Sequence, residues 1–99
     1  MIIIYGFVKT KANMNSKFVQ TLCEIQNEIR KMEGCVRNEW YQVPGSLHRY
    51  VIYGEFDTKE NFEKYLGSSA VKRIDNELIP LLDAPPEIKH YADTCLESS

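Results

Sequence analysis

The sequence predicts an α+β fold in the order β-α-β-β-α-β, which is the ferredoxin-like arrangement of a four-stranded antiparallel sheet with helices on one face. Three observations predict it. A strongly apolar run opens the chain, an amphipathic helical pattern follows, and two alternating runs then flank a turn. The 99 residues fit one domain, with a core over residues 1–94 and a short tail over 95–99.

The first predicted strand covers residues 2–9 and is rich in β-branched and aromatic residues. Its apolar side chains occupy both faces: Ile2, Ile4 and Val8 on one, Ile3, Tyr5 and Phe7 on the other. Helices can cover only one of these faces, so we expect a second covering layer on the other.

An amphipathic helix is predicted next, because apolar residues recur at spacings of three and four. They are Phe18, Leu22, Ile25, Ile29 and Met32. Asn15 or Ser16 is the expected N-cap of this helix, and Gly34 is its expected stop.

A β-hairpin follows, with strands over about 36–43 and 49–56 around a turn at residues 44–46. The second helical region starts at the capping residues Asp57 and Thr58 and is divided at Gly67. Pro80 forces a kink or a restart, because proline lacks the backbone donor that a helix needs. The last predicted strand covers residues 87–94.

Charge and composition narrow the possible partners. The formal net charge is −2 and no Lys/Arg block occurs, so no nucleic-acid partner is expected. No apolar segment reaches the length of a membrane span, and we expect a cytoplasmic protein without a membrane partner. The cysteines Cys23, Cys35 and Cys95 form no C-x-x-C pair, and their odd number suits a reducing compartment; Cys23 and Cys35 are interpreted as structural thiols.

Three stretches of the chain resemble the antibiotic biosynthesis monooxygenase family. They are MEGCV at 32–36, YVIYGEF at 50–56 and LIPLLDAPPEIKHY at 78–91. Together with the element order, the resemblance spans essentially the whole chain. It implies a homodimer in which two sheet faces meet as a dimeric α+β barrel. It also implies oxygenation of a small aromatic or quinol-type metabolite without a metal or flavin cofactor.

The chain departs from the family at several polar positions. Many members resemble one another in a His at the end of the short helix and in a Ser-x-His sequence after it, where this chain has Tyr65 and Ala70. The strand position that is often Trp is Phe56. Haem-degrading members are similar in an Asn on the first strand, where this chain offers Gly6, so haem degradation is not expected.

The candidate site combines aromatic, amide and acidic side chains in a pocket between sheet and helices. The predicted catalytic residues are His90, Tyr65 and Glu55, and the predicted substrate-binding residues are Asn38, Trp40, Tyr53 and Phe62. An imidazole suits a general base, an indole stacks on aromatic ligands, and a phenol can hydrogen-bond a ligand. No His, Cys and carboxylate cluster has metal-ligand spacing, so no metal site is expected.

Each of these residues also has an explanation that needs no chemistry. His90 can satisfy a hydrogen bond at the sheet edge, Trp40 can lie in a dimer interface, and Tyr65 can pack between helix and sheet. Glu55 can pair with a neighbouring arginine. The alternative function is therefore a non-catalytic homodimer of the same fold that binds a small molecule or serves as an interaction module.

Overall fold

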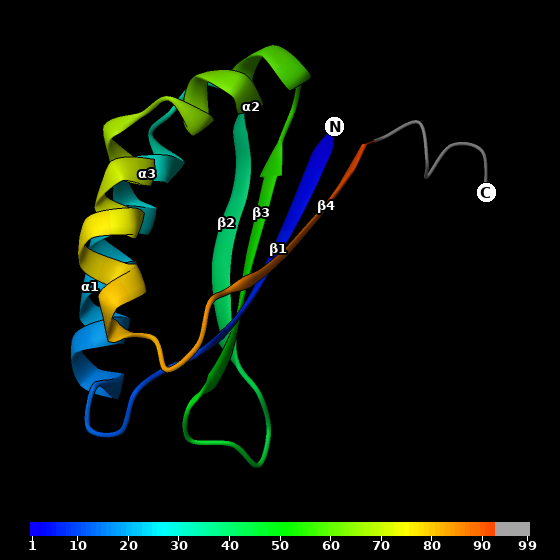
Figure 1. The fold of residues 1–99 in the computed structure, drawn as a ribbon. Helices are drawn as coiled ribbons and strands as arrows, with labels where there is room; N and C mark the ends of the chain where they lie inside the picture. The colour runs from blue at the N-terminus through cyan, green and yellow to red at the C-terminus, as the bar shows by residue number, and fades with distance from the viewer. Residues whose placement is uncertain (93–99) are drawn as a thin grey trace.

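The computed structural model describes residues 1–92 and confirms the α+β, ferredoxin-like order (Figure 1). Four strands form one antiparallel sheet in the order β2-β3-β1-β4. They are β1 (Ile2–Lys9), β2 (Cys35–Gln42), β3 (Arg49–Phe56) and β4 (Glu87–Ala92). The predicted strand end at residue 94, Cys95 and the tail over 95–99 lie outside the described residues.

The helices lie together on one side of the sheet (Figure 1). They are α1 (Asn15–Arg30), α2 (Lys59–Leu66) and α3 (Ser69–Arg73). Helix α3 continues into a π-helical turn, η1 (Ile74–Leu78), and a 3-10 turn, η2 (Ile79–Leu81). Pro80 lies in η2, so the interruption that its missing donor predicts is confirmed. We call the covered side of the sheet the helical face and the other side the open face.

The predicted N-cap of α1 is wrong. Met14 precedes the helix without a side-chain cap, and Asn15 is already its first residue. The Asn15 side chain bonds across the fold instead: its Oδ1 accepts from Thr10 Oγ1 at 2.8 Å, and its Nδ2 donates to the Leu47 carbonyl. This amide fastens the start of α1 to the end of β1 and to the hairpin turn.

The predicted start of α2 is confirmed. Thr58 accepts a hydrogen bond from the backbone N–H of Asn61 at 3.2 Å, which is N-cap geometry. Helix α1 ends at Arg30, and Gly34 lies in the turn that follows, with φ of +85°. Only glycine adopts this conformation without cost, and a side chain there would collide with Asp57 and Asn61.

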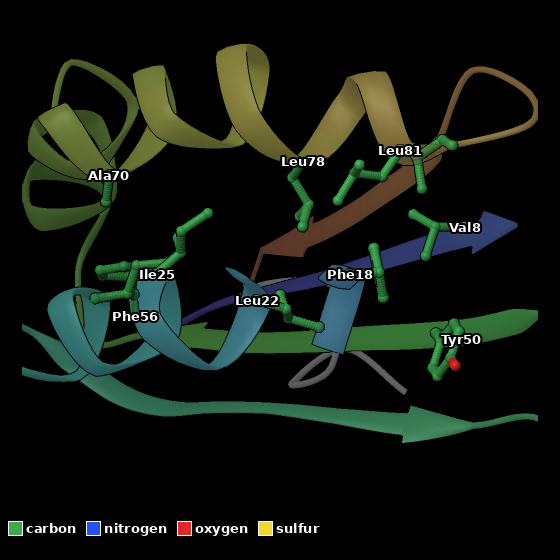
Figure 2. Packing of buried hydrophobic residues seen from close by; sticks show 11 residues of the cluster. Val8, Phe18, Leu22, Ile25, Tyr50, Phe56, Ala70, Leu78 and Leu81 are labelled. Carbon is green, nitrogen blue, oxygen red and sulfur yellow. The ribbon is translucent and has the colours of Figure 1, made fainter. Parts of the chain in front are cut away.

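The core lies between the helices and the helical face (Figure 2). Phe18, Leu22, Ile25 and Ile29 of α1 are buried, as the helical spacing predicts. They meet buried residues from the sheet and from the second helical region: Val8, Tyr50, Phe56, Ala70, Leu78, Leu81 and Leu82.

Candidate functional site

The strand register divides the predicted site residues between the two faces of the sheet. Asn38, Trp40 and His90 occupy helical-face positions of their strands, and Phe62 and Tyr65 of α2 pack on the same face. Tyr53 and Glu55 lie on the open face, because they alternate with the buried Phe56. Within the single chain the predicted residues therefore form two groups, separated by the sheet.

An aromatic cluster joins α2 to one end of the helical face. The Phe62 ring lies 6.1 Å from the Tyr65 ring and 6.2 Å from the His90 ring, between centroids. Phe56, which is fully buried, contacts both phenyl rings of α2, with centroid distances of 4.9 Å to Tyr65 and 6.0 Å to Phe62. His90 and Tyr65 thus flank one phenylalanine.

The Tyr65 phenol remains protonated at neutral pH. Burial raises its pKa above its ordinary value, and the nearby Cys35 and Asp75 raise it further. A protonated phenol donates a hydrogen bond but does not accept a substrate proton. Tyr65 can therefore orient or stabilise a ligand, whereas the neighbouring imidazole of His90 is the group in this cluster that can take up a proton.

Asn38 lies between the sheet and α1, and only 6% of it is exposed. It faces Gly54 across the strand pair, and a methyl group on Gly54 would lie 3.1 Å from the Asn38 side-chain nitrogen. Among the described residues, its side-chain oxygen has no hydrogen-bond partner. A buried polar atom without a hydrogen-bond partner lowers the stability of the fold. Packing alone therefore does not explain why an amide oxygen is buried at this position.

Gln26 is a buried polar residue that the sequence analysis did not single out. It is 1% exposed, and neither its Nε2 nor its Oε1 has a partner within residues 1–92. Arg30, one helical turn later, donates from Nε to the backbone carbonyl of Asn38 at 2.9 Å, so this side of α1 faces β2. The signal was present in the sequence, because Gln26 follows Leu22 by four and thus occupies the buried stripe.

The Asn38 amide and the His90 imidazole lie at the two ends of one row of cross-strand partners. Asn38 pairs with Gly54, Gly54 with Ile4, and Ile4 with His90. Three strand spacings of about 4.8 Å separate their Cα atoms by roughly 14 Å. One small ring therefore cannot contact both groups.

Asn38 also lines an open hollow of about 350 Å³ at the outer edge of β2. The hollow lies beside a β-bulge between Cys35 and Arg37, and Arg30 forms part of its wall. Burial raises the pKa of the Cys35 thiol, which leaves it protonated and unreactive and agrees with a structural role. Trp40, next along β2, packs edge-to-face on Tyr50 with centroids 5.7 Å apart.

The open face carries the second group of predicted residues. The Tyr53 hydroxyl donates to Glu55, and burial together with this bond raises the pKa of Tyr53 to about 12. Tyr5 contacts Tyr53 and Tyr91, at centroid distances of 5.1 Å and 6.2 Å. Phe7 is 40% exposed beside them. The open face is thus aromatic and is not covered by other parts of the described chain.

Two kinds of feature are absent from residues 1–92. These residues contain no group of three or more His, Cys, Asp or Glu side chains placed to hold a metal ion. None of the helices in this part of the chain combines the length and apolarity that crossing a bilayer requires.

Known structures share this fold closely. A conserved protein from Methanosarcina mazei Go1 superposes with a TM-score of 0.85 at 22% identity, over 91% of this chain and 89% of its own. A candidate antibiotic biosynthesis monooxygenase from Deinococcus radiodurans gives 0.85 at 19% identity, over 93% and 91%. A third, from Nitrosomonas europaea, gives 0.85 at 13% identity, over 93% and 97%. At these identities the likeness is one of fold.

The sequence itself supplies the assignment to a family. No curated protein matches the chain. The family model described as antibiotic biosynthesis monooxygenase matches residues 1–76, which include the first three strands, α1, α2 and α3. This match covers the first two motifs, at 32–36 and 50–56, and agrees with the fold. The chain belongs to the antibiotic biosynthesis monooxygenase family.

Proposed function

We propose that this protein is a cofactor-independent monooxygenase that acts on a small fused-ring phenol or quinol held between the sheet and the helices. The observation that carries the proposal is a pair of buried amides: both side-chain polar atoms of Gln26 and the Oδ1 of Asn38 lack partners among the described residues. A phenolic hydroxyl both donates and accepts hydrogen bonds, so a bound quinol can satisfy such amides. Family membership supplies the reaction class.

The reaction needs no external reductant, because the substrate supplies all the electrons. The quinol loses a hydroxyl proton to a base, and the resulting anion transfers one electron to dioxygen. Recombination of the two radicals forms a carbon–oxygen bond, and loss of water leaves a carbonyl. Quinol and dioxygen thus give a hydroxyquinone and water, with one oxygen atom in each product.

Each predicted site residue on the helical face has a role in this scheme. His90 is the base, and Phe62 forms the apolar wall beside it. Tyr65 donates a hydrogen bond to the developing oxyanion, since its pKa is raised. Asn38 anchors the far ring of the substrate, and Trp40 contributes an aromatic surface next to it.

We propose further that two copies of the chain associate through their open faces. The aromatic side chains of this face, including Tyr5, Phe7 and Tyr91, gain burial when a second sheet covers them. A twofold axis would bring each charged side chain of this face near the same side chain of the other copy. Arg37 lies 3.8 Å from Glu39, and this pairing offsets part of the resulting repulsion. Tyr53 and Glu55 belong to this interface in the proposal, rather than to the substrate pocket.

Oxygen uptake by the metal-free protein tests the proposed chemistry. The panel consists of hydroquinone, naphthohydroquinones and anthrone, with the buffer rate as the baseline. We expect uptake with the fused-ring compounds, at least tenfold slower for His90→Ala and for Asn38→Leu. Lys59→Gln, an exposed change on α2, serves as the control and should leave the rate unchanged. Uptake that equals the buffer rate for every compound would refute the proposal.

The alternative, a binding module without catalysis, has one specific observation in its favour. Ala70 is 3% exposed and packs in the core, at a place where many family members carry a polar group. If naphthohydroquinones quench the emission of Trp40 but cause no oxygen uptake, the protein binds such ligands without oxygenating them.

A further inference from the structure

Two glycines lie in the middle of the helical face of the sheet. Gly6 lies in β1 and Gly54 in β3, the two central strands, and neither is a terminal residue of its strand. Gly54 pairs with Ile4 and Gly6 pairs with Ile52, so the two glycines are diagonal neighbours on the same face. A glycine inside a strand weakens the strand and often marks a place where a ligand approaches the backbone closely.

Neither backbone conformation nor crowding explains the glycine at position 6. The φ angle of Gly6 lies outside the left-handed range that favours glycine. A Cβ atom at this position would meet no heavy atom closer than the Cβ of Ile52, at 3.7 Å, which is ordinary van der Waals contact. An alanine would therefore fit, and it would lose less conformational freedom on folding. The fold alone gives no reason for a glycine here.

The glycine at position 54 makes room for the side chain of Asn38. A Cβ atom on Gly54 would lie 3.1 Å from the Asn38 Nδ2, which is closer than ordinary contact, so the amide lies against this glycine. Asn38 is 6% exposed, and its Oδ1 has no hydrogen-bond partner among residues 1–92. A buried polar atom without a partner therefore adjoins the glycines, and it indicates a ligand independently of them.

The helical face is less tightly covered in its middle than at its ends. Val8 and Tyr50 are buried at one end and Phe56 is buried at the other, as Figure 2 shows. Between them, on the same face of the same two strands, Ile4 and Ile52 are only partly buried. The part of the face that carries the glycines is therefore the part that solvent, and hence a ligand, can reach.

We propose that Gly6 and Gly54 form the floor of the substrate site and determine its specificity for flat ring systems. The rings of the ligand lie over the two glycines in van der Waals contact, bordered by Ile4 and Ile52. A hydroxyl group of the ligand bonds the Asn38 amide. The inference rests on the proposed function for the chemical class of the ligand, and it adds the residues that select the ligand by its shape.

Binding measured under argon separates the glycine floor from the proposed oxygenase activity. The probes are naphthohydroquinone, which is flat, and its tetrahydro derivative, which has the same two hydroxyl groups but a saturated, puckered second ring. Calorimetric titration measures both affinities. We expect the wild type to bind the flat probe at least tenfold more tightly. This preference without oxygen uptake in air would support the floor and refute the oxygenase.

Alanine substitutions of glycine test the floor itself. Gly6→Ala should weaken naphthohydroquinone binding at least tenfold, while its midpoint of urea unfolding stays at or above that of the wild type. Gly67→Ala is the matched control, because Gly67 is exposed at the end of α2 and a Cβ atom there meets nothing closer than 3.9 Å; it should leave the affinity unchanged.

Four results would each overturn the assignment. They are no binding of naphthohydroquinone by the wild type, equal affinities for the flat and the puckered probe, equal affinities of Gly6→Ala and Gly67→Ala, and a lower urea midpoint of Gly6→Ala. The last result would show that the fold itself requires a glycine at position 6.

Discussion

Replacing Gln26 by leucine should make this protein more stable. An unpaired buried polar group costs about 1–3 kcal/mol, and Gln26 carries two such atoms. Leucine is apolar and of similar size, so it removes the penalty without opening a large cavity. We expect the free energy of unfolding to rise by about 2 kcal/mol, which for a domain of this size raises Tm by roughly 8–16 °C.

Urea unfolding followed by circular dichroism gives this difference, at one protein concentration for all variants. Gln20→Leu is the matched control, because Gln20 lies on the same helix and is exposed. It should change stability by no more than about 0.5 kcal/mol. Most core substitutions to a different residue type destabilise, so a gain confined to position 26 is a specific result.

The same variant separates stability from function. If Gln26 is retained to hold a ligand, Gln26→Leu should gain stability and lose affinity for naphthohydroquinone. The reasoning is refuted if Gln26→Leu is no more stable than Gln20→Leu. The amide would then be satisfied, for example by bound water, and would provide no argument for a ligand site.

Three other predictions concern the turn, the open face and the interface. Gly34→Ala should destabilise by about 3 kcal/mol in urea unfolding, because the left-handed conformation costs about 1–2 kcal/mol and the new methyl collides with Asp57 and Asn61, whose side chains bond each other at the start of α2. Gly45→Ala, with a similar φ and open space, should lose only the conformational part. The free energy of unfolding should fall between pH 10 and about 12, because Tyr53 ionises near pH 10 in the unfolded chain and only near pH 12 in the folded one. Tyr53→Phe should reduce that fall, and identical pH profiles of the two proteins would contradict this. In sedimentation velocity at micromolar concentration the wild type should be a dimer and Tyr5→Arg should be a monomer. Leu47→Arg, a change in the exposed hairpin turn, should still be a dimer. A monomeric wild type would exclude the interface.

The element order could be predicted from the sequence because periodicity and turn residues act locally. The spacing of Phe18, Leu22 and Ile25 identified α1, and Thr58 identified the start of α2. The cap of α1 could not be predicted in this way. Asn15 has a capping side chain, but Leu47, far away in sequence, offers it a partner that competes with the helix N-terminus.

The candidate site was predicted less completely than the fold. The aromatic cluster of Phe62, Tyr65 and His90 does come together, because α2 packs over the sheet end to which β4 returns. Tyr53 and Glu55 were grouped with them on chemical grounds, and register places them on the other face. Periodicity describes one element at a time, so it does not show which residues of different strands share a face.

Isotopically labelled dioxygen provides the most direct test of the central claim, that the chain oxygenates a fused-ring quinol without a cofactor. The metal-free protein is incubated with labelled dioxygen and naphthohydroquinone, and the product is analysed by mass spectrometry. The account predicts one labelled oxygen atom in each hydroxyquinone molecule. The wild type should form this product faster than buffer does, and His90→Ala should form it at the buffer rate. An unlabelled quinone, or a labelled product formed at the same rate with and without protein, would contradict it.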